Sequence, residues 1–216
     1  MSKYLNQPLE KYLNDLSARL PAPGGGSAAA LVASTGVSLL CMVANFTIDK
    51  KGYEEYRDEI KSILAKLEKN RVKLNDLIDE DVAAYEKVSE VYKLPQNTEH
   101  EKKQRELTIQ SVLKEAMSVP YEIMEISINS ISYSKKLAII GNKSLISDIS
   151  CGVFFLRSAI EAARDNVIIN LNSIKDKSFV EQKTKALELS VSAVLTEIDK
   201  IIISVNSLLN TDKRGK

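Results

Sequence analysis

The chain has 216 residues, of which 44% are hydrophobic and 27% charged, a composition typical of globular rather than disordered or fibrous proteins. Thirty Lys and Arg residues against 29 Asp and Glu leave a net charge of +1, so the strong positive field of a nucleic-acid or anionic-membrane binder is missing. One hydrophobic core can serve a chain of this length, and we expect a single domain over residues 1–216 with a frayed tail at 212–216.

The two cysteines, Cys41 and Cys151, lie in apolar stretches and are too few for a disulfide framework. We therefore expect both to be buried thiols in a reducing compartment. The first residues lack the apolar core of a signal peptide, and we expect a cytoplasmic protein.

Apolar residues recur at spacings of three and four along most of the chain, which predicts an all-α fold. The first helix is expected to run over residues 9–20, with Pro8 in its first turn, and to stop at Pro21.

A helix rich in small residues is expected over residues 28–46, with Ser27 as its N-cap. Ala29, Ala33 and Gly36 fall on one face of it, where another helix can approach closely. Because this helix is apolar on all sides, we expect it to lie in the protein core rather than in a membrane.

The remaining helices are expected over residues 53–92, 98–120, 120–140, 145–174 and 178–209. The first of these exceeds the usual helix length, so an interruption is expected within it. Thr98 and Glu101 have capping-box spacing, and Pro120 is expected to separate two helices because proline lacks a backbone N–H. The sequence thus predicts a bundle of seven to eight helices around the small-residue helix.

The most distinctive local pattern is Gly24-Gly25-Gly26-Ser27, which follows Pro23 and precedes the small-residue helix. Consecutive glycines are expected where a ligand approaches the main chain, and a helix N-terminus offers free N–H groups to an anion or a polar ring. A tight corner that admits the helix to the core is the competing interpretation. Neither a Walker sequence nor a dinucleotide-binding fingerprint is present.

Asp81 and Asp148 are acidic residues in otherwise apolar surroundings, and a buried carboxylate is costly unless it is paired or functional. Ordinary solvent exposure of Asp81 and a helix-capping role for Asp148 are the competing interpretations. The lone histidine, His100, falls in a polar stretch and is expected to be exposed. A zinc site or a Ser-His-Asp triad cannot be assembled around it, so acid–base work is left to carboxylates, Lys or Tyr.

Asn166 and Asn170 are one helical turn apart and share a face, where they can bind a ligand or hold helices together. Lys50, Lys51 and Arg105 are candidates for binding carboxylates, although most of the thirty basic residues are expected to be solvated.

Several segments together resemble the cyclodeaminase/cyclohydrolase family of folate enzymes. They are Pro21 to Ala30, Met42 to Ile48, Lys50-Lys51, Asp81 to Tyr85, Leu94-Pro95, Val119-Pro120, Gly141-Asn142, Ser147-Asp148 and Asn166 to Asn170. The resemblance covers nearly the whole chain in order, and the glycine-rich segment with its following helix is quite specific.

The resemblance implies an all-α homodimer whose folate site lies at or near the subunit interface. It implies one of two reactions: cyclisation of 5-formiminotetrahydrofolate to 5,10-methenyltetrahydrofolate with release of ammonia, or reversible hydrolysis of the methenyl ring to 10-formyltetrahydrofolate. The expected ligand is a tetrahydrofolate derivative, with or without a polyglutamate tail, and no further cofactor, metal, nucleic acid or membrane is expected. A non-catalytic helical dimer that binds folate or scaffolds a partner is the alternative function.

Residue roles follow as hypotheses from residue type and family position. Asp81, Asp148 and Lys50 are the expected catalytic residues. The expected substrate-binding residues are Gly24, Gly25, Gly26, Ser27, Lys51, Arg105, Asn142, Ser147, Asn166 and Asn170.

Overall fold

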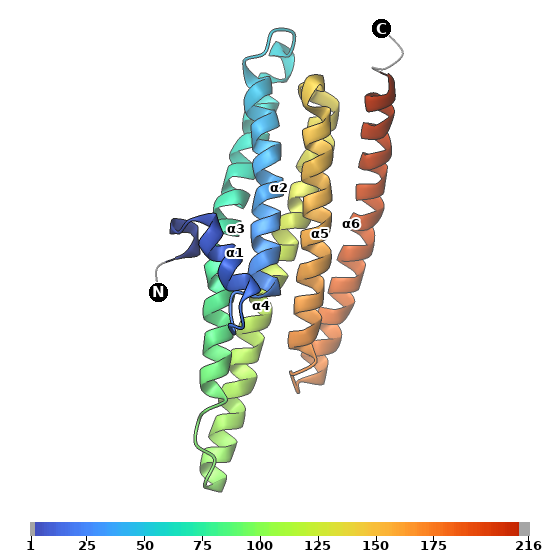
Figure 1. The fold of residues 1–216 in the computed structure, drawn as a ribbon. Coiled ribbons are helices and arrows are strands. Elements are labelled where there is room, and N and C mark those ends of the chain that lie inside the picture. Colours follow the sequence, from blue (N-terminus) through green and yellow to red (C-terminus); the bar gives the residue numbers. More distant parts are fainter. Residues whose placement is uncertain (1–2, 212–216) are drawn as a thin grey trace.

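The computed structural model describes residues 3–211, and all regular secondary structure within that range is helical (Figure 1). The α-helices are α1 (Leu9–Ser17), α2 (Gly25–Ile48), α3 (Arg57–Val91), α4 (Glu99–Ile140), α5 (Ile146–Leu171) and α6 (Lys177–Thr211). Short 3₁₀ turns η1 (Tyr4–Asn6), η2 (Glu54–Tyr56) and η3 (Lys143–Leu145) precede α1, α3 and α5. The all-α prediction is confirmed, whereas the expected seven to eight α-helices are six in the described range.

The small-residue helix α2 lies inside the bundle, where it packs against α3, α4 and α5 (Figure 1). Ala30, Ala33 and Val37 are fully buried along it. The approach of α5 is closest at Gly36, where a Cβ atom would lie 2.9 Å from the carbonyl oxygen of Gly152. The predicted close helix approach is confirmed, and it depends on a second glycine from α5.

The prediction that Pro120 separates two helices is wrong, because α4 runs through it without a break and Pro120 is buried. Proline removes one intrahelical hydrogen bond. Apolar residues on both sides of it, among them Ile109 and Leu137, belong to the same core, so burial of both halves holds the helix together. The expected interruption of α3 is also absent, since Arg57–Val91 is one continuous helix.

Two further predictions need correction. Ser27 is not the N-cap of α2, because the helix begins earlier, at Gly25, and Gly24 takes the capping position. Cys151 is exposed, because the neighbouring Gly152 and Val153 form the inward face of α5. Cys41 is buried as predicted, and burial raises the pKa of its thiol to about 12, so the thiol stays protonated.

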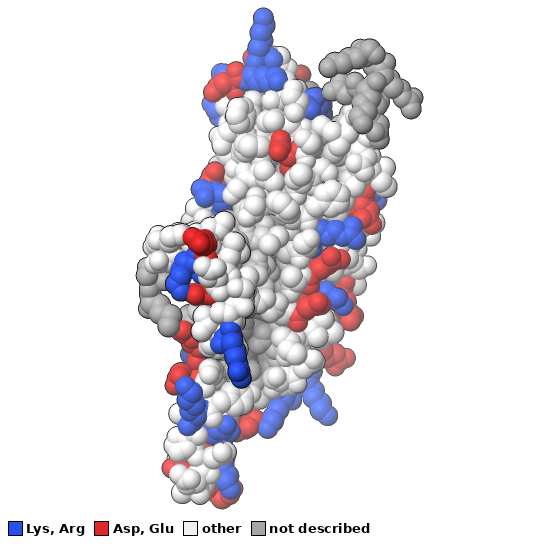
Figure 2. All heavy atoms as spheres, viewed as in Figure 1, with Lys and Arg blue, Asp and Glu red and all other residues white. Residues whose placement is uncertain are grey.

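One face of α2 remains outside the core. The helix is long and apolar enough to cross a membrane by length and composition, yet 61% of its most apolar stretch is buried in the bundle. The exposed part includes Phe46 and continues onto α5 at Phe154 and Phe155, which are 63%, 46% and 39% exposed. Figure 2 shows that charged side chains are sparse over this face, which we call the α2/α5 face.

Candidate functional site

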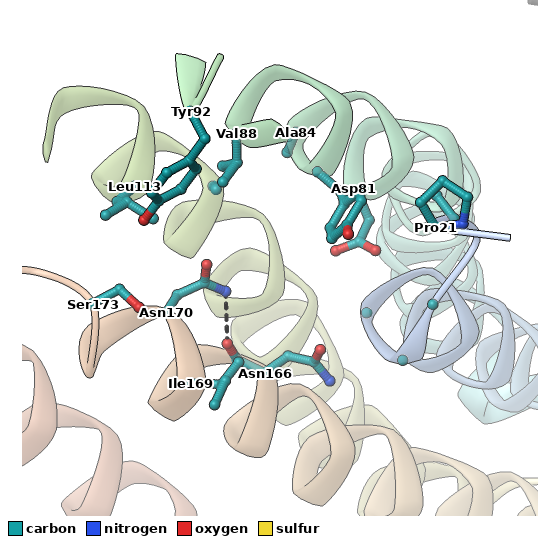
Figure 3. Close-up of a pocket in the computed structure, with 16 residues that line it drawn as sticks. Pro21, Asp81, Ala84, Val88, Tyr92, Leu113, Asn166, Ile169, Asn170 and Ser173 are labelled. Carbon is teal, nitrogen blue, oxygen red and sulfur yellow. Dashed lines mark hydrogen bonds between the residues drawn. The ribbon is translucent and has the colours of Figure 1, made fainter. Parts of the chain in front are cut away.

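A pocket with a volume of about 400 Å³ lies where α2 begins, between α3 and α5. The surface is hollowed in this region in Figure 2, and Figure 3 shows the side chains around the hollow. Its lining residues are Pro21, Ala22, Gly24, Gly25, Gly26, Asp81, Ala84, Tyr85, Val88, Tyr92, Leu113, Ala116, Asn166, Ile169, Asn170 and Ser173. The glycine segment, Asp81 and the two asparagines, predicted separately from the sequence, therefore share one pocket.

Asp81 reaches from α3 to the first turn of α2. Its Oδ2 atom accepts a hydrogen bond of 2.8 Å from the backbone N–H of Ser27. Gly24 has no side chain with which to cap α2, so Asp81 supplies the carboxylate that a helix N-terminus favours. The carboxylate lies directly against Gly26, where a Cβ atom would come within 2.1 Å of Oδ1. The glycine at 26 thus makes room for the acid.

The environment of Asp81 favours its neutral form. Burial raises the pKa of Asp81, and the hydrogen bond from Ser27 N–H lowers it without cancelling the rise. Among the described residues that line the pocket, Asp81 is the only Asp, Glu, Lys or Arg, so no cation offsets its charge. A carboxyl group in this setting can give up and take back a proton near the pocket centre.

The opposite wall carries Asn166 and Asn170 of α5 (Figure 3). The side-chain nitrogen of Asn166 donates to the carbonyl oxygen of Ala162, and that of Asn170 donates to the carbonyl oxygen of Asn166, each at 2.8 Å. Each amide nitrogen donates one of its two N–H groups to its own helix and keeps the other, so the two asparagines can offer both a donor and an acceptor oxygen to a ligand. With Asp81, the pocket holds several hydrogen-bond acceptors.

The far end of the pocket is formed by Tyr92, Leu113 and Ser173 (Figure 3). Arg105 lies behind this end and does not line it. Its Nη2 atom donates to the carbonyl oxygen of Tyr92 at 3.0 Å, and its guanidinium lies 5.7 Å from the centre of the Tyr92 ring.

The other predicted site residues lie at the opposite end of α2, about 36 Å away for a helix of 24 residues. Lys50 Nζ donates to Asn142 Oδ1 at 2.7 Å just beyond the C-terminus of α2. The exposed Lys51 is next in sequence, and Ser147 and Asp148 lie in the first turn of α5. We call this group, Lys50, Lys51, Asn142, Ser147 and Asp148, the distal cluster. One subunit does not bring it together with the pocket.

Two predictions about single residues can be compared with the structure. His100 is exposed at the start of α4, as predicted. Asp148 is not an N-cap but the third residue of α5, which follows Leu145 at the capping position.

Sequence reasoning missed several lining residues on α3. Tyr85, Val88 and Tyr92 follow Asp81 by four, seven and eleven residues, which is the spacing of one helical face. Extending that face from Asp81 would have found them. The hydroxyl of Tyr12 lies 3.2 Å from the hydroxyl of Ser27, a contact that no spacing in the sequence indicates.

The fold and the pocket together define an all-helical protein with one partly buried acid and several amide and hydroxyl oxygens around a pocket of a size that suits a small molecule. Such a pocket complements a ligand that donates hydrogen bonds or carries positive charge. The chain belongs to the formiminotransferase-cyclodeaminase family, whose model matches residues 8–189.

The relatives include proteins of the same length and longer ones. The chain is 36% identical over 207 residues to a methenyltetrahydrofolate cyclohydrolase of Methylorubrum extorquens, covering 95% of this chain and 99% of that protein. It is 34% identical to a formimidoyltransferase-cyclodeaminase of Gallus gallus, covering 81% of this chain but only 32% of that protein. A crystal structure of a formiminotetrahydrofolate cyclodeaminase from Thermotoga maritima superposes with a TM-score of 0.79 at 32% identity, covering 95% of this chain and 97% of the other.

Proposed function

We propose that this chain is a folate one-carbon enzyme that forms or opens the 5,10-methenyl bridge of tetrahydrofolate, as a cyclodeaminase or a cyclohydrolase. Relatives of matching length carry both names, so length does not separate the two reactions. The observation that carries the proposal is the partly buried Asp81 carboxyl beside Gly26 and Ser27, in a pocket whose other lining residues are uncharged. We further propose that the enzyme is cytoplasmic and uses no cofactor beyond its folate substrate.

The same carboxyl group can serve either reaction. In cyclodeamination N10 attacks the formimino carbon, and the leaving amine needs a proton, which a protonated Asp81 supplies as ammonia departs. In hydrolysis water attacks the methenyl carbon and loses a proton to the Asp81 carboxylate. Asp81 then returns that proton to N5 as the bond from the carbon to N5 breaks, and the new hydroxyl releases its proton to solvent as it becomes the formyl oxygen. In both directions the negative carboxylate stabilises the cationic one-carbon bridge.

The remaining lining suits a pterin and its aryl chain. The N–H groups of a pterin can donate to the oxygens of Asn166 and Asn170. Tyr85 and Tyr92 offer aromatic surface along α3, and the eleven residues from Asp81 to Tyr92 span about 16 Å. We therefore propose that the one-carbon unit lies at Asp81 and that the tail points toward Tyr92 and Arg105.

The Asp81→Asn variant tests the catalytic role directly. Asparagine keeps an oxygen for the Ser27 N–H but cannot exchange a proton, so turnover should fall by roughly 10²–10⁴-fold. The matched control is Asp76→Asn, which changes a half-exposed carboxylate on the same helix that pairs with Lys3. Near-normal turnover by Asp81→Asn would remove Asp81 from the mechanism.

Two assays separate the two reactions. Purified protein is given formiminotetrahydrofolate, and released ammonia is measured. In parallel it is given methenyltetrahydrofolate, and loss of methenyl absorbance is followed against the spontaneous rate. Ammonia release identifies a deaminase and faster loss of absorbance a hydrolase, while a chain that binds folate but performs neither reaction is the non-catalytic alternative.

We also propose that the chain works as a homodimer through the α2/α5 face. An exposed, charge-poor surface with Phe46, Phe154 and Phe155 is typical of an interface. An antiparallel pairing of two α2 helices would carry the distal cluster of one subunit toward the pocket of the other. This arrangement supplies Lys50 and Asp148 to a pocket that has no cation of its own among its described lining residues.

Mixing two inactive variants tests this arrangement. If each pocket takes Asp81 from one subunit and Asp148 from the other, re-associating Asp81→Asn with Asp148→Asn subunits restores one intact site in half of the dimers. Activity should then return to about a quarter of the wild-type value. A mixture that stays inactive, or a chain that is monomeric by light scattering, would contradict the shared site.

A further inference from the structure

Helix α1 lies beside the start of α2, and its one buried residue is Tyr12. The Tyr12 hydroxyl is 3.2 Å from the hydroxyl of Ser27, and both side chains are almost completely shielded from water. Leu9 and Leu13 of α1 are exposed, and Leu16 is partly buried against the core. Tyr12 is therefore the point at which α1 engages the core beside the pocket.

Ser27 connects this contact to the proposed catalytic acid. Its backbone N–H donates to Asp81 Oδ2 at 2.8 Å, while its hydroxyl pairs with Tyr12. Asp81 has no other hydrogen bond among the contacts of the described residues, so the position of the first turn of α2 decides how well its carboxylate is supported.

The groups around Asp81 come from five helices. Tyr12 on α1 is titratable, whereas the adjoining turn of α2 carries only glycine and serine. Helix α3 contributes Asp79, which lies within electrostatic range of Tyr12, and Tyr85 in the pocket lining. Helices α4 and α5 add only apolar, amide and hydroxyl groups to the lining. Burial raises the pKa of Tyr12, so the phenol stays protonated and able to donate.

We propose that Tyr12 is a positioning residue for the reaction: through the Ser27 hydroxyl it holds the first turn of α2 where the Ser27 N–H supports the Asp81 carboxylate. The inference rests on the proposed function of Asp81 and adds a residue outside the pocket lining to it. It also assigns a role to α1, which has little other contact with the core.

The Tyr12→Phe variant tests the proposal. Phenylalanine keeps the ring in the core and removes only the hydroxyl that pairs with Ser27. With the first turn less firmly held, the hydrogen bond to Asp81 weakens and the carboxylate loses support, so Asp81 takes up a proton at a higher pH. We expect kcat to fall by about tenfold, the size of one lost buried hydrogen bond. The limb of the pH profile that Asp81 sets should move to higher pH: the acidic limb if the carboxylate acts as base in hydrolysis, the basic limb if the protonated group acts as acid in cyclodeamination.

The matched control is Tyr4→Phe. The Tyr4 hydroxyl donates to Asp15 on α1 at 2.8 Å, so this variant also loosens α1 but leaves Ser27 untouched. Its pH profile should match that of the wild type. The double variant Tyr12→Phe/Ser27→Ala should have the same kcat as Ser27→Ala alone, because each hydroxyl acts only through its contact with the other.

A second readout does not need turnover. Carbon-13 NMR of the Asp81 carboxyl, assigned with Asp81→Asn, follows its titration in the free protein, and Tyr12→Phe should titrate at a higher pH than the wild type. Unchanged titration and pH profile in Tyr12→Phe would overturn the positioning role. A wild-type protein that turns over neither folate would count against the proposed function instead, while the NMR titration would still decide the link from Tyr12 to Asp81.

Discussion

Gly26 and Gly36 lie ten residues apart on α2, both are buried, and both would suffer a clash if they carried a side chain. At Gly36 a Cβ would meet the backbone oxygen of Gly152 at 2.9 Å, and at Gly26 it would meet the Asp81 carboxylate at 2.1 Å. In the first case two helices are in contact through their backbones. In the second, a helix N-terminus holds a functional group. Identical residues on one helix thus make room for a neighbouring helix at its middle and for the proposed catalytic carboxylate at its start.

The comparison predicts its largest effect at Gly26. In Gly26→Ala the new methyl group displaces the Asp81 side chain, which can rotate away into the pocket at little cost in stability. A displacement of about 1 Å in a catalytic group can reduce turnover by about 10²-fold. We expect a loss of this size, measured as kcat, with a melting temperature close to that of the wild type.

Gly24→Ala is the control for this prediction, because a Cβ there has nothing within 4 Å. It should leave the hydrogen bond from Ser27 to Asp81 as it is. If Gly26→Ala retained full turnover, the position of the Asp81 carboxylate against Gly26 would not matter for catalysis.

Gly36→Ala should show the reverse pattern. The methyl group meets a backbone that cannot rotate away, so α2 and α5 must move apart, at a cost of about 1–3 kcal/mol. For a chain of this size each kcal/mol lowers the melting temperature by about 2–4 °C. Turnover per folded molecule should change much less than in Gly26→Ala. A Gly36→Ala protein with an unchanged melting temperature would contradict the backbone contact.

The sequence predicted the helices more fully than it predicted the contacts between them. Apolar periodicity is a local property, and it predicted the helices well except at Pro120, where core packing on both sides of the proline outweighed its local effect. Gly36 was placed on a close-packing face, but its partner Gly152 was not found, because a contact between distant segments leaves no periodic trace.

The site was predicted in part for the same reason. Residue type indicated that Asp81 and Asn166 were functional candidates, and the fold brings them to one pocket. The helix predicted over residues 28–46 already separates Lys50 from the glycine segment. Residue type could not indicate that Asp148 lies at the same end as Lys50, since that depends on the direction in which α5 runs. Nor could it reveal the contact between Tyr12 and Ser27, which joins two helices through one pair of hydroxyls.

The smallest predicted effect concerns stability and its dependence on pH. Burial raises the pKa of Asp81 in the folded protein, so the contribution of this group to stability is fully present below its unfolded pKa and is lost as the pH rises through the folded pKa. Above its folded pKa the wild type therefore carries a partly buried charge that Asp81→Asn does not. We expect Asp81→Asn to melt higher by roughly 2–4 °C at neutral pH, with the difference shrinking in acid, even though it is inactive.

Gly36→Ala provides the contrast, because its loss of stability comes from a backbone clash and should be the same at every pH. Calorimetry of both variants from acid to neutral pH measures the two patterns side by side. An Asp81→Asn protein less stable than the wild type at neutral pH would mean that the ionised carboxylate stabilises the start of α2 more than its burial costs. Asp81 would then act mainly as the cap of α2. Gly26, like Gly36, would in that case serve the stability of the fold, and the contrast between the two glycines would not hold.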